Sequence, residues 1–458
     1  MGIKIAILGA AGLRTPLILQ AILLRQARLN LRELALMDID GQRLEVIAAL
    51  TAPLEAANPP RFHIQRTTDV ELALQGADFV ITTFRVGGMT ARAIDERVPL
   101  NYGVLGQETT GPGGFAMGMR TIPALLAVAE KMKSLCPQAW LINFANPAGM
   151  LAEALVRVSG WQRSVGICDA PHTLRRALAA LLNAPAEQVL LDYFGLNHLG
   201  WIRAVRFQGA DHLPRFLEWI RQLDQVPGMP VSATLIATLG MIPNEYLYYY
   251  YHTRQAVENI LQAGLSRGEQ LAAWNERLFA ELADLRAKED YEGMQSAYQA
   301  YLKQRGKTYM VSESGQAHNL EQIDGALAES LSSEGYAGVA LDLIEGLCGD
   351  GPRQMILNIP NQGSIQGMGA EDVVEIAAFV SGGVIQPLSV GSIPQHCLGL
   401  MQQVKAYEQL TIEAAVEGSY AKALTALTLH PLVPGFEVAK QILDEYIQRH
   451  GDLFPPLR

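Results

Sequence analysis

The sequence predicts an α/β protein in which a parallel sheet in the first half is followed by a second, more helical domain. Three observations carry this prediction. An apolar run at residues 3–8 leads directly into Gly9-Ala10-Ala11-Gly12, short apolar runs then alternate with longer amphipathic stretches, and the second half is mostly helical in pattern. Strands that alternate with helices place parallel strands side by side in one sheet. We expect one domain at residues 1–170 and a second at residues 171–458.

The composition describes a large globular protein with an acidic balance. The chain has 458 residues, 49% of them hydrophobic and 18% charged, which suffices for a core in two domains. Its net charge of −10 disfavours nucleic acid and membrane surfaces as partners, because their phosphates would be repelled, so an anionic substrate needs a local cluster of arginines. The four cysteines are too scattered for a disulfide framework, and no apolar run resembles a signal peptide or spans a bilayer. We therefore expect a cytoplasmic protein.

The first expected element is a central strand at residues 3–8, which is apolar apart from Lys4. The glycine loop follows at once, with Thr15 as the expected helix N-cap and Pro16 in the first helical turn. A helix that starts this close to a glycine loop aims free backbone N–H groups at an anion, which in dinucleotide-binding proteins is a pyrophosphate. Gly9 and Gly12 are therefore candidate cofactor-binding residues.

The next expected strand, residues 34–37, ends in Asp38-Ile39-Asp40. An acid at this point accepts hydrogen bonds from the adenosine ribose and repels a 2′-phosphate, so Asp38 predicts NAD in preference to NADP. Arg43 nearby weakens that preference. Because the glycine loop has alanine at two places, a parallel α/β domain without a cofactor is the alternative.

Polar residues follow the three remaining strands expected in the first half, at residues 79–83, 140–144 and 165–167. These residues are Arg85, Asn146 and the pair Cys168-Asp169. Ligands of open α/β sheets bind outside the carboxyl ends of the strands, so we expect one crevice lined by all three segments. A polar, glycine-rich loop at residues 106–114, ahead of a helix expected at 121–135, is a candidate wall of this crevice.

Cys168 and His198 are candidate metal ligands. Cys168 follows a short buried strand, which fixes the aim of its thiol and of the adjoining Asp169 carboxylate, and His198 follows the aromatic pair Tyr193-Phe194. A soft ligand, a nitrogen ligand and a nearby proton donor suit a catalytic metal ion. The alternatives are a cysteine packed as a small hydrophobe and a histidine hydrogen-bonded in the core. Only a fold that joins the two segments favours the metal.

The second half opens on a β-rich stretch at residues 193–207. It then turns helical, with helices expected at residues 213–223, 267–285, 290–304 and 397–417. Five tyrosines between Asn244 and His252 interrupt this pattern. Such an aromatic run is more often core or interface, and one of its phenols becomes a candidate base only where a cation lowers its pKa.

Six segments spread over nearly the whole chain carry a family resemblance: Phe84-Arg85-Val86-Gly87-Gly88, Leu105-Gly106-Gln107-Glu108-Thr109-Thr110-Gly111-Pro112-Gly113-Gly114, Asn143-Phe144-Ala145-Asn146-Pro147, Gly166-Ile167-Cys168-Asp169, Tyr193-Phe194-Gly195-Leu196-Asn197-His198-Leu199-Gly200-Trp201 and Cys397-Leu398-Gly399-Leu400-Met401-Gln402-Gln403-Val404-Lys405-Ala406-Tyr407-Glu408. Together they resemble family four of the glycoside hydrolases, the NAD- and manganese-dependent 6-phospho-glucosidases. Within that family the chain is more similar to the 6-phospho-β-glucosidase branch.

The resemblance implies an N-terminal Rossmann-type parallel sheet and a C-terminal α+β domain of lactate/malate dehydrogenase type that holds substrate and metal. Family members assemble as dimers or tetramers, so a homo-oligomer is expected. The resemblance also implies two cofactors, NAD and a divalent metal held by Cys168 and His198. Ligand softness alone favours zinc or ferrous iron, whereas the family implies Mn²⁺, whose remaining ligands are hard sugar oxygens and water. Arg14, beside the glycine loop, joins the cofactor-binding candidates.

The implied chemistry is a hydrolysis that runs through redox and elimination steps, an exception to the usual two-carboxylate mechanism. The sugar is oxidised at carbon 3 by NAD, which acidifies the proton at carbon 2, and the metal polarises the ketone. By matching position, Tyr246 corresponds to the base that removes this proton and Asp169 to the acid that protonates the departing oxygen. Water then adds and NADH returns the hydride.

The implied substrate is a 6-phospho-β-glucoside or a related anionic glycoside. Arg85, Arg92 and Arg267 are candidates to bind its phosphate and Asn146 to bind its hydroxyls, with a surface ion pair as the alternative for each arginine. The chain departs from the family pattern at Gly9-Ala10-Ala11-Gly12 with Arg14, at Arg305-Gly306-Lys307-Thr308-Tyr309-Met310 and at Gly349-Asp350-Gly351-Pro352. These departures leave the anionic group and the anomer open.

Two other functions compete with the glycosidase. A NAD-dependent hydroxyacid or polyol dehydrogenase on the same fold would accumulate NADH, whereas the glycosidase regenerates NAD at each turnover. A non-catalytic NAD-sensing protein would keep its ligand response after replacement of Cys168 or Tyr246.

Overall fold

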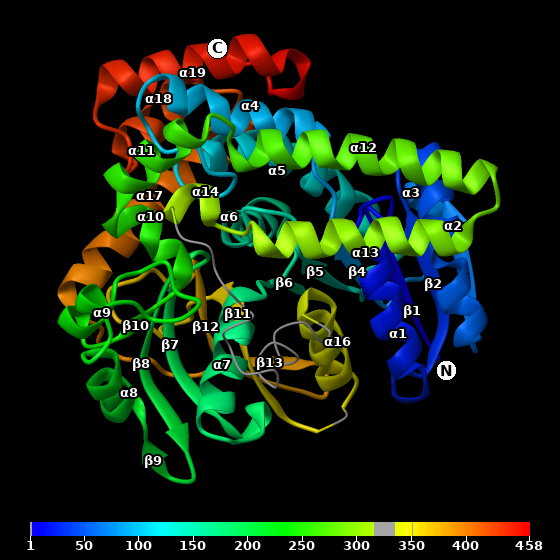
Figure 1. Cartoon of the computed structure of the whole chain (residues 1–458), viewed down its shortest axis with the longest axis horizontal. Coiled ribbons are helices and arrows are strands. Elements are labelled where there is room, and N and C mark those ends of the chain that lie inside the picture. The colour runs from blue at the N-terminus through cyan, green and yellow to red at the C-terminus, as the bar shows by residue number, and fades with distance from the viewer. Residues whose placement is uncertain (1, 316–334, 350) are drawn as a thin grey trace.

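A nine-stranded sheet forms the centre of the computed structural model, which describes residues 2–315, 335–349 and 351–458 (Figure 1). The strand order is β13-β12-β11-β6-β5-β4-β1-β2-β3. Its strands are β1 (Ile3–Leu8), β2 (Leu31–Met37), β3 (His63–Thr67), β4 (Phe79–Thr82), β5 (Trp140–Asn143), β6 (Ser164–Gly166), β11 (Arg353–Pro360), β12 (Val373–Ser381) and β13 (Val384–Pro387).

The six strands from the first half form the parallel part of this sheet. β1 pairs in parallel with β2 and β4, and the order β3-β2-β1-β4-β5-β6 is that of dinucleotide-binding folds. The apolar run at residues 3–8 forms β1 in full, because a central strand is covered on both faces and Ile5, Ala6 and Ile7 are completely buried. The predicted α/β class with a parallel sheet is confirmed.

The start of α1 (Thr15–Leu29) differs from the prediction. Thr15 was expected to cap this helix, but Thr15 is its first residue and the cap position is Arg14, whose side chain makes no capping hydrogen bond. Thr15 is instead buried, with 2% of its surface exposed. Pro16 lies in the first turn as expected, where its missing N–H is not needed.

Three strands from the second half extend the sheet beyond β6. β11 pairs antiparallel with β6 at Asn358 and Gly166, and β12 and β13 continue antiparallel from there. A separate four-stranded sheet contains β7 (Leu190–Leu196), β8 (Leu199–Phe207), β9 (Ala210–Asp211) and β10 (Ile242–Pro243). The stretch predicted to be β-rich, residues 193–207, lies within β7 and β8, which pair as an antiparallel hairpin whose turn carries His198.

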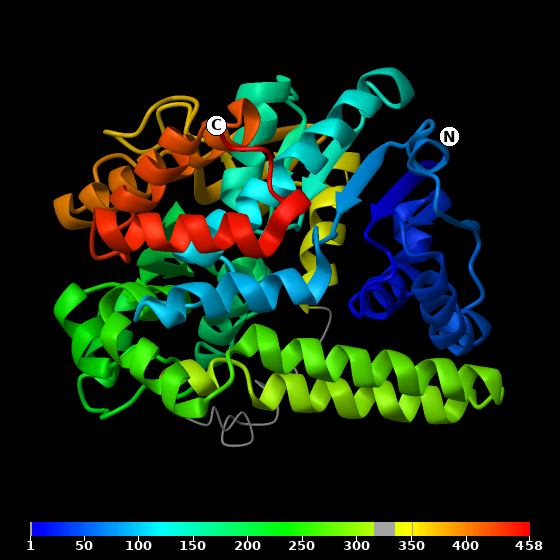
Figure 2. The ribbon, with the colours of Figure 1, turned by 90° about the horizontal axis from the view of Figure 1, so that it is seen from above.

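Helices connect and surround the strands. They are α2 (Gly41–Ala57), α3 (Val70–Leu74), α4 (Gly88–Asn101), α5 (Pro112–Leu135), α6 (Ala148–Ala154), α7 (Ala170–Leu181), α8 (Leu213–Ile220), α9 (Ala233–Leu239), α10 (Tyr248–Tyr251), α11 (Thr253–Ala263), α12 (Arg267–Ala287), α13 (Tyr291–Lys307), α14 (Val311–Ser314), α16 (Gly335–Cys348), α17 (Gln395–Glu417), α18 (Tyr420–Leu429) and α19 (Phe436–His450). The long α12 and α13 lie side by side in both views (Figures 1 and 2).

The predicted start of α5 is wrong. The helix was expected from residue 121 but begins at Pro112, so the last three residues of the predicted glycine-rich loop form its first turn. Glycine makes this possible, because a Cβ on Gly113 or Gly114 would overlap the carbonyl oxygens of Gln107 and Thr109. The amino end of α5 is thus packed directly onto the loop that precedes it.

Every helix in the described ranges is too short or too polar to cross a bilayer. The four cysteines are free, as their scattered positions predicted. One of the three segments that depart from the family pattern includes residue 350, which lies outside the described ranges.

Candidate active site

The fold brings Cys168 and His198 together. Cys168 follows the carboxyl end of β6, and His198 occupies the β7–β8 turn with a positive φ of 63°. The Cys168 Sγ and His198 Nε2 atoms lie 3.5 Å apart, and both side chains are buried. This arrangement favours the metal over two unrelated packing residues, because the two donor atoms face one another.

His198 is held on two sides. The Thr109 Oγ1 atom lies 2.7 Å from His198 Nδ1, and the Tyr246 ring stacks on the imidazole with 3.7 Å between centroids and 12° between planes. Burial lowers the pKa of His198 to about 4, so the imidazole is neutral at pH 7. A neutral imidazole is the form that binds metal ions.

The donor pair fits a divalent cation. A metal about 2.3 Å from a thiolate and about 2.1 Å from an imidazole at a near-tetrahedral angle separates the two atoms by about 3.5 Å. Burial raises the pKa of Cys168 well above its ordinary value, and the carboxylates of Glu375 and Asp169 raise it further, so the thiolate needs a cation beside it. Among the described residues, no cluster of three or more His, Cys, Asp or Glu could hold a metal, which leaves other coordination positions to ligands from outside the chain.

Asp169 and Tyr246 flank this pair. Asp169 directly follows Cys168 and precedes α7, where its side chain is half-buried. Tyr246 lies in a short 3-10 turn (Glu245–Leu247), and the Tyr309 hydroxyl lies 3.1 Å from the Tyr246 hydroxyl. Burial raises the pKa of Tyr246 well above its ordinary value, so the phenol becomes a base only next to a cation.

Arg85 and Arg92 converge on the carboxylate of Glu108. The Glu108 Oε2 atom lies 2.7 Å from one arginine and 2.8 Å from the other. Burial alone would raise the pKa of Glu108, but Arg92 and Arg85 lower it to about 2. Arg92 is also 2.8 Å from Glu96 and is only 6% exposed, so the alternative of a surface ion pair is wrong for this residue.

Arg267 lies at the start of α12 and is anchored to the end of α13. Its guanidinium donates to the Arg305 carbonyl oxygen at 2.8 Å and to Thr308 Oγ1 at 2.7 Å. Arg305 itself helps to lower the pKa of Glu108, after Arg92 and Arg85. The structure therefore adds Arg305 and Glu108 to the predicted arginines. Both residues lie in segments quoted in the sequence analysis, but no pattern in the sequence showed that the charge of one acts on the other.

Asn146 follows β5 and precedes Pro147 across a cis peptide bond, and its side chain is half-buried. α6 begins two residues later and packs tightly on the hairpin turn, since a Cβ on Gly149 would stand 3.1 Å from the Cβ of Asn197. The segment that follows β5 and the His198 turn are therefore neighbours.

The cofactor candidates surround the end of β1. Gly9 has a φ of 99°, and a Cβ there would stand 2.5 Å from the Phe84 backbone nitrogen, so only glycine fits. The Asp38 carboxylate accepts hydrogen bonds from the backbone N–H of Ala11 at 2.9 Å and of Asp40 at 3.1 Å. Asp38 thus braces the glycine loop, a role the sequence did not show, while Gly12 and Arg14 are exposed beside it.

Glu375 of β12 is a buried residue that the sequence analysis missed. Its carboxylate accepts hydrogen bonds from Tyr193 at 2.6 Å, Asn358 at 3.0 Å and Asn197 at 3.2 Å. Burial raises the pKa of Glu375 to about 7. This network ties the His198 turn to β11 and β12, and no local signal marks it because its members are far apart in the sequence.

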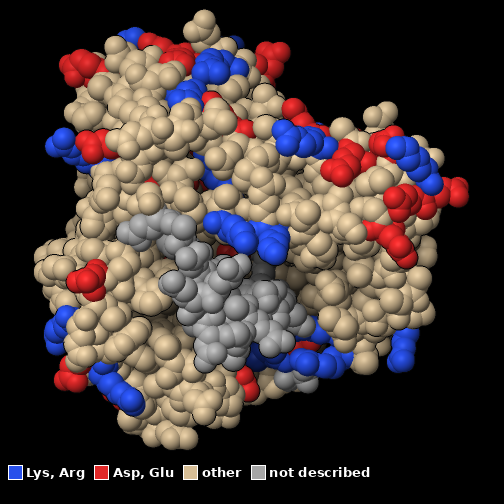
Figure 3. Space-filling view, viewed as in Figure 1, with Lys and Arg blue, Asp and Glu red and all other residues tan. Residues whose placement is uncertain are grey.

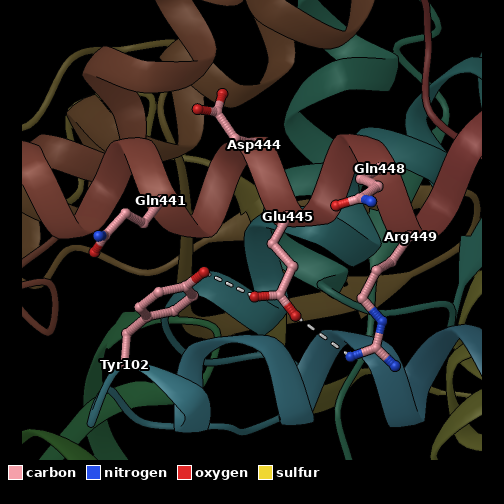
Figure 4. Close-up of a pocket in the computed structure, with 6 residues that line it drawn as sticks. All are labelled: Tyr102, Gln441, Asp444, Glu445, Gln448 and Arg449. Atoms are coloured by element: carbon pink, nitrogen blue, oxygen red, sulfur yellow. Dashed lines mark hydrogen bonds and ion pairs between the residues drawn. The ribbon is translucent and has the colours of Figure 1, made fainter.

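One surface groove lies away from the Cys168–His198 pair. A polar groove runs along α19 and is lined by Tyr102, Gln441, Asp444, Glu445, Gln448 and Arg449 (Figure 4). Within it the Tyr102 hydroxyl donates to Glu445 at 2.8 Å. Over the described part of the face in Figure 3, acidic and basic side chains are interspersed, so the negative net charge is not gathered into one patch there.

A dinucleotide-binding sheet with a buried Cys–His pair at its carboxyl edge defines a class of cofactor-dependent enzyme rather than a simple binding domain. Comparison with known families places it within that class. Residues 4–184 match the family model described as "Family 4 glycosyl hydrolase". Residues 193–433 match the model described as "Family 4 glycosyl hydrolase C-terminal domain". The chain belongs to glycosyl hydrolase family 4.

Curated relatives match over almost the full length. The chain is 34% identical to a probable 6-phospho-beta-glucosidase of Bacillus subtilis, covering 99% of this chain and 98% of the relative. It is 31% identical to a 6-phospho-alpha-glucosidase of Leptotrichia buccalis, with 99% of each chain covered.

Solved structures agree with these matches. The 6-phospho-beta glucosidase of Thermotoga maritima, solved with manganese, NAD+ and glucose-6-phosphate, has a TM-score of 0.83 and 27% identity over 100% of both chains. A 6-phospho-alpha-glucosidase from gut microorganisms, solved with NAD and Mn2+, has a TM-score of 0.82 and 28% identity over 100% of both chains.

Proposed function

We propose that this protein hydrolyses 6-phospho-glucosides through an oxidation, elimination, addition and reduction cycle that depends on NAD and a divalent metal. The observation that carries the proposal is the 3.5 Å approach of Cys168 Sγ to His198 Nε2 at the carboxyl edge of a dinucleotide-binding sheet. Two-carboxylate hydrolysis needs no such pair. Relatives that act on 6-phospho-glucosides, and solved structures with NAD and manganese, support the same conclusion.

Two groups of residues hold the cofactors. Gly9, Gly12 and Arg14 would present the loop and charge for a pyrophosphate, and Asp38 would accept hydrogen bonds from a ribose with the lone pairs that its two backbone contacts leave free. Cys168 and His198 hold the metal. When bound, NAD supplies reversible oxidation of the sugar ring and the metal supplies Lewis-acid polarisation of the oxidised carbon's oxygen.

Two side chains move protons. Tyr246, stacked on His198, lies where a bound cation favours its phenolate, and it removes the proton from carbon 2 of the sugar. Asp169 protonates the departing glycosidic oxygen, and its half-buried carboxyl is available for this role because it does not cap α7.

The phosphate site is built from Arg85, Arg92 and Arg267, with Asn146 toward the sugar hydroxyls. Arg85 and Arg92 already bind a carboxylate together, which shows that their guanidinium groups can share one anion. Relatives of the β and α types match at similar identity, so we propose the β-glucoside first and test both.

The compartment and assembly follow from the same proposal. A phosphorylated substrate and four free cysteines suit the reducing cytoplasm. We expect a homo-oligomer, with residues 1–170 binding the dinucleotide and residues 171–458 supplying substrate and metal ligands and the oligomer contacts. Size-exclusion chromatography with light scattering measures the assembly, and a monomer at micromolar concentration contradicts it.

The deciding experiment is a panel of nitrophenyl glycosides, with and without the 6-phosphate and in both anomers, assayed with Mn²⁺, NAD and a thiol. We expect cleavage of 6-phospho-glucosides only, complete loss in excess EDTA and recovery with Mn²⁺. NADH absorbance separates the competing dehydrogenase, because hydrolysis leaves no net NADH. Cleavage that persists after exhaustive EDTA treatment rules out the proposed mechanism.

A further inference from the structure

The loop between α4 and α5 reaches the candidate metal site through Thr109. The Thr109 Oγ1 atom lies 2.7 Å from His198 Nδ1 and 3.1 Å from the Oε1 atom of Gln107. The sequence placed this loop at the wall of the crevice but gave Thr109 and Gln107 no role. Their contacts fix where the protons of this cluster lie.

The orientation of the Gln107 amide is determined by the backbone. Its Oε1 atom accepts hydrogen bonds from the backbone N–H of Thr109 at 2.7 Å and of Thr110 at 2.6 Å. A reversed amide would aim its NH₂ group at two N–H donors, which is repulsive. The atom facing Thr109 is therefore a carbonyl oxygen, and it can only accept.

The Thr109 hydroxyl has a single proton to donate. If that proton pointed to His198, the Thr109 and Gln107 oxygens would face each other at 3.1 Å with no proton between them. If it points to Gln107, both contacts are satisfied, since the Thr109 oxygen then accepts from His198 Nδ1–H. Only the second arrangement places one proton in each short contact.

We propose that Thr109, oriented by Gln107, is a positioning residue that keeps His198 in the tautomer protonated at Nδ1. The Nε2 lone pair then faces Cys168 Sγ, 3.5 Å away, and is available to a metal. Stacking on Tyr246 holds the ring against rotation, so the hydroxyl selects the tautomer and not merely the ring position. This inference rests on the proposed function, in which His198 is a metal ligand.

Other metal sites indicate how much the loss of the Thr109 hydroxyl should weaken metal binding. Hydrogen-bond partners of a ligating histidine change metal affinity by about 10- to 100-fold when removed. Thr109→Val keeps the shape of the side chain and removes the hydroxyl, whereas Thr109→Ser keeps the hydroxyl. Thr110→Val is a matched control in the same loop, because the Thr110 Oγ1 atom is buried without a hydrogen-bond partner in the described structure.

The test is the dissociation constant of Mn²⁺ for the purified full chain without substrate, measured by titration calorimetry. We expect Thr109→Val to bind Mn²⁺ about 10- to 100-fold more weakly than the wild type, and Thr109→Ser and Thr110→Val to bind it within about threefold. Binding that is lost in Cys168→Ser but unchanged in Thr109→Val overturns this inference alone. Binding that survives Cys168→Ser overturns the metal assignment and the proposed function with it.

A second measurement needs no change to the loop. Nitrogen-15 NMR of the metal-free wild type labelled at histidine distinguishes protonated from bare ring nitrogens, and a His198→Gln spectrum assigns the signals. We expect His198 to carry its proton on Nδ1 and none on Nε2. The reverse pattern contradicts the inference whatever the metal titration shows.

Discussion

Cys168 and Asp169 are neighbours in the chain but occupy different environments. Cys168 is 7% exposed and faces His198, whereas Asp169 is half-buried at the start of α7. Both residues lie in the short connection between β6 and α7, where the chain changes direction. In the proposed mechanism, this difference in burial separates the metal ligand from the acid.

Replacement of Asp169 by Asn tests the acid at the residue scale. We expect kcat on a disaccharide phosphate to fall by about 10²- to 10⁴-fold, because an alkoxide leaves only with a proton. On a nitrophenyl 6-phospho-glucoside the loss should be much smaller, since nitrophenolate leaves unaided. Steady-state kinetics on both substrates measures the difference, and an equal loss on both assigns Asp169 another role.

His430 gives a prediction on stability and pH. It lies against the Tyr407 ring, 4.5 Å between centroids, and burial lowers its pKa from 6.5 to about 3. In the unfolded chain it takes a proton below pH 6.5, while in the folded chain it stays neutral, so acidification favours unfolding. Between pH 7 and pH 5 this residue should lower the free energy of unfolding by about 2 kcal/mol.

The measurement is urea unfolding of the wild type and of His430→Gln at both pH values. We expect the variant to lose about 2 kcal/mol less than the wild type between pH 7 and pH 5. Other buried groups titrate in the same range, but they are common to both proteins and cancel in the comparison. The same pH dependence in both proteins would show that His430 is protonated in the folded state.

At the scale of elements, the amino end of α5 determines how the Thr109 loop lies. Gly113 and Gly114 let the first helical turn pack on the carbonyl groups of Gln107 and Thr109. No other residue leaves enough room for this contact. The loop is therefore held by two contacts: its carbonyl groups pack against the two glycines, and its Thr109 hydroxyl contacts His198.

Gly113→Ala tests this packing. The added methyl group forces the loop and helix apart, and we expect a loss of about 1–3 kcal/mol in stability together with weaker Mn²⁺ binding. Gly399→Ala is the matched control, because Gly399 is an exposed position inside α17 with open space around it, and alanine there should stabilise by about 1 kcal/mol. Thermal unfolding and Mn²⁺ titration measure both. An unchanged melting temperature and Mn²⁺ affinity in Gly113→Ala would show that the loop moves to accommodate the methyl group without a cost in stability.

Elements were predictable where their own residues determine them. β1 and β4 follow from continuous apolar runs, and α12 from its periodicity and its capping box at Ser266 and Glu269. The start of α5 and the supporting contacts of the site were not predictable. Thr109 meets His198 across 89 positions and Tyr193 meets Glu375 across 182, and only the folded chain defines such pairs.

At the scale of the molecule, the two halves of the chain share one sheet. β6 from the first half is paired with β11 from the second, and α1 packs on α16, where Arg25 lies 2.7 Å from Asp342. A chain cut at the predicted boundary near residue 170 would expose an edge of β6 and a face of α1. We therefore expect the first half to depend on the second for its stability.

A fragment of residues 1–170 tests this dependence. We expect it to lack a cooperative unfolding transition, because its sheet edge and helix face lose their cover, while the full chain should unfold in one step by both fluorescence and circular dichroism. Urea titrations of the two proteins provide the measurement. A fragment that unfolds cooperatively would establish residues 1–170 as an independent folding unit.

The carboxylate that joins Arg85 to Arg92 has a consequence for selectivity. If these arginines bind the substrate phosphate as proposed, the incoming anion must displace Glu108 or share the two guanidinium groups with it. A phosphate dianion carries more charge than a carboxylate, whereas a sulfate ester or a uronic acid carries only one negative charge. We therefore expect 6-phosphate sugars to have lower inhibition constants than 6-sulfate and uronate sugars, and equal constants for all three would contradict this selectivity.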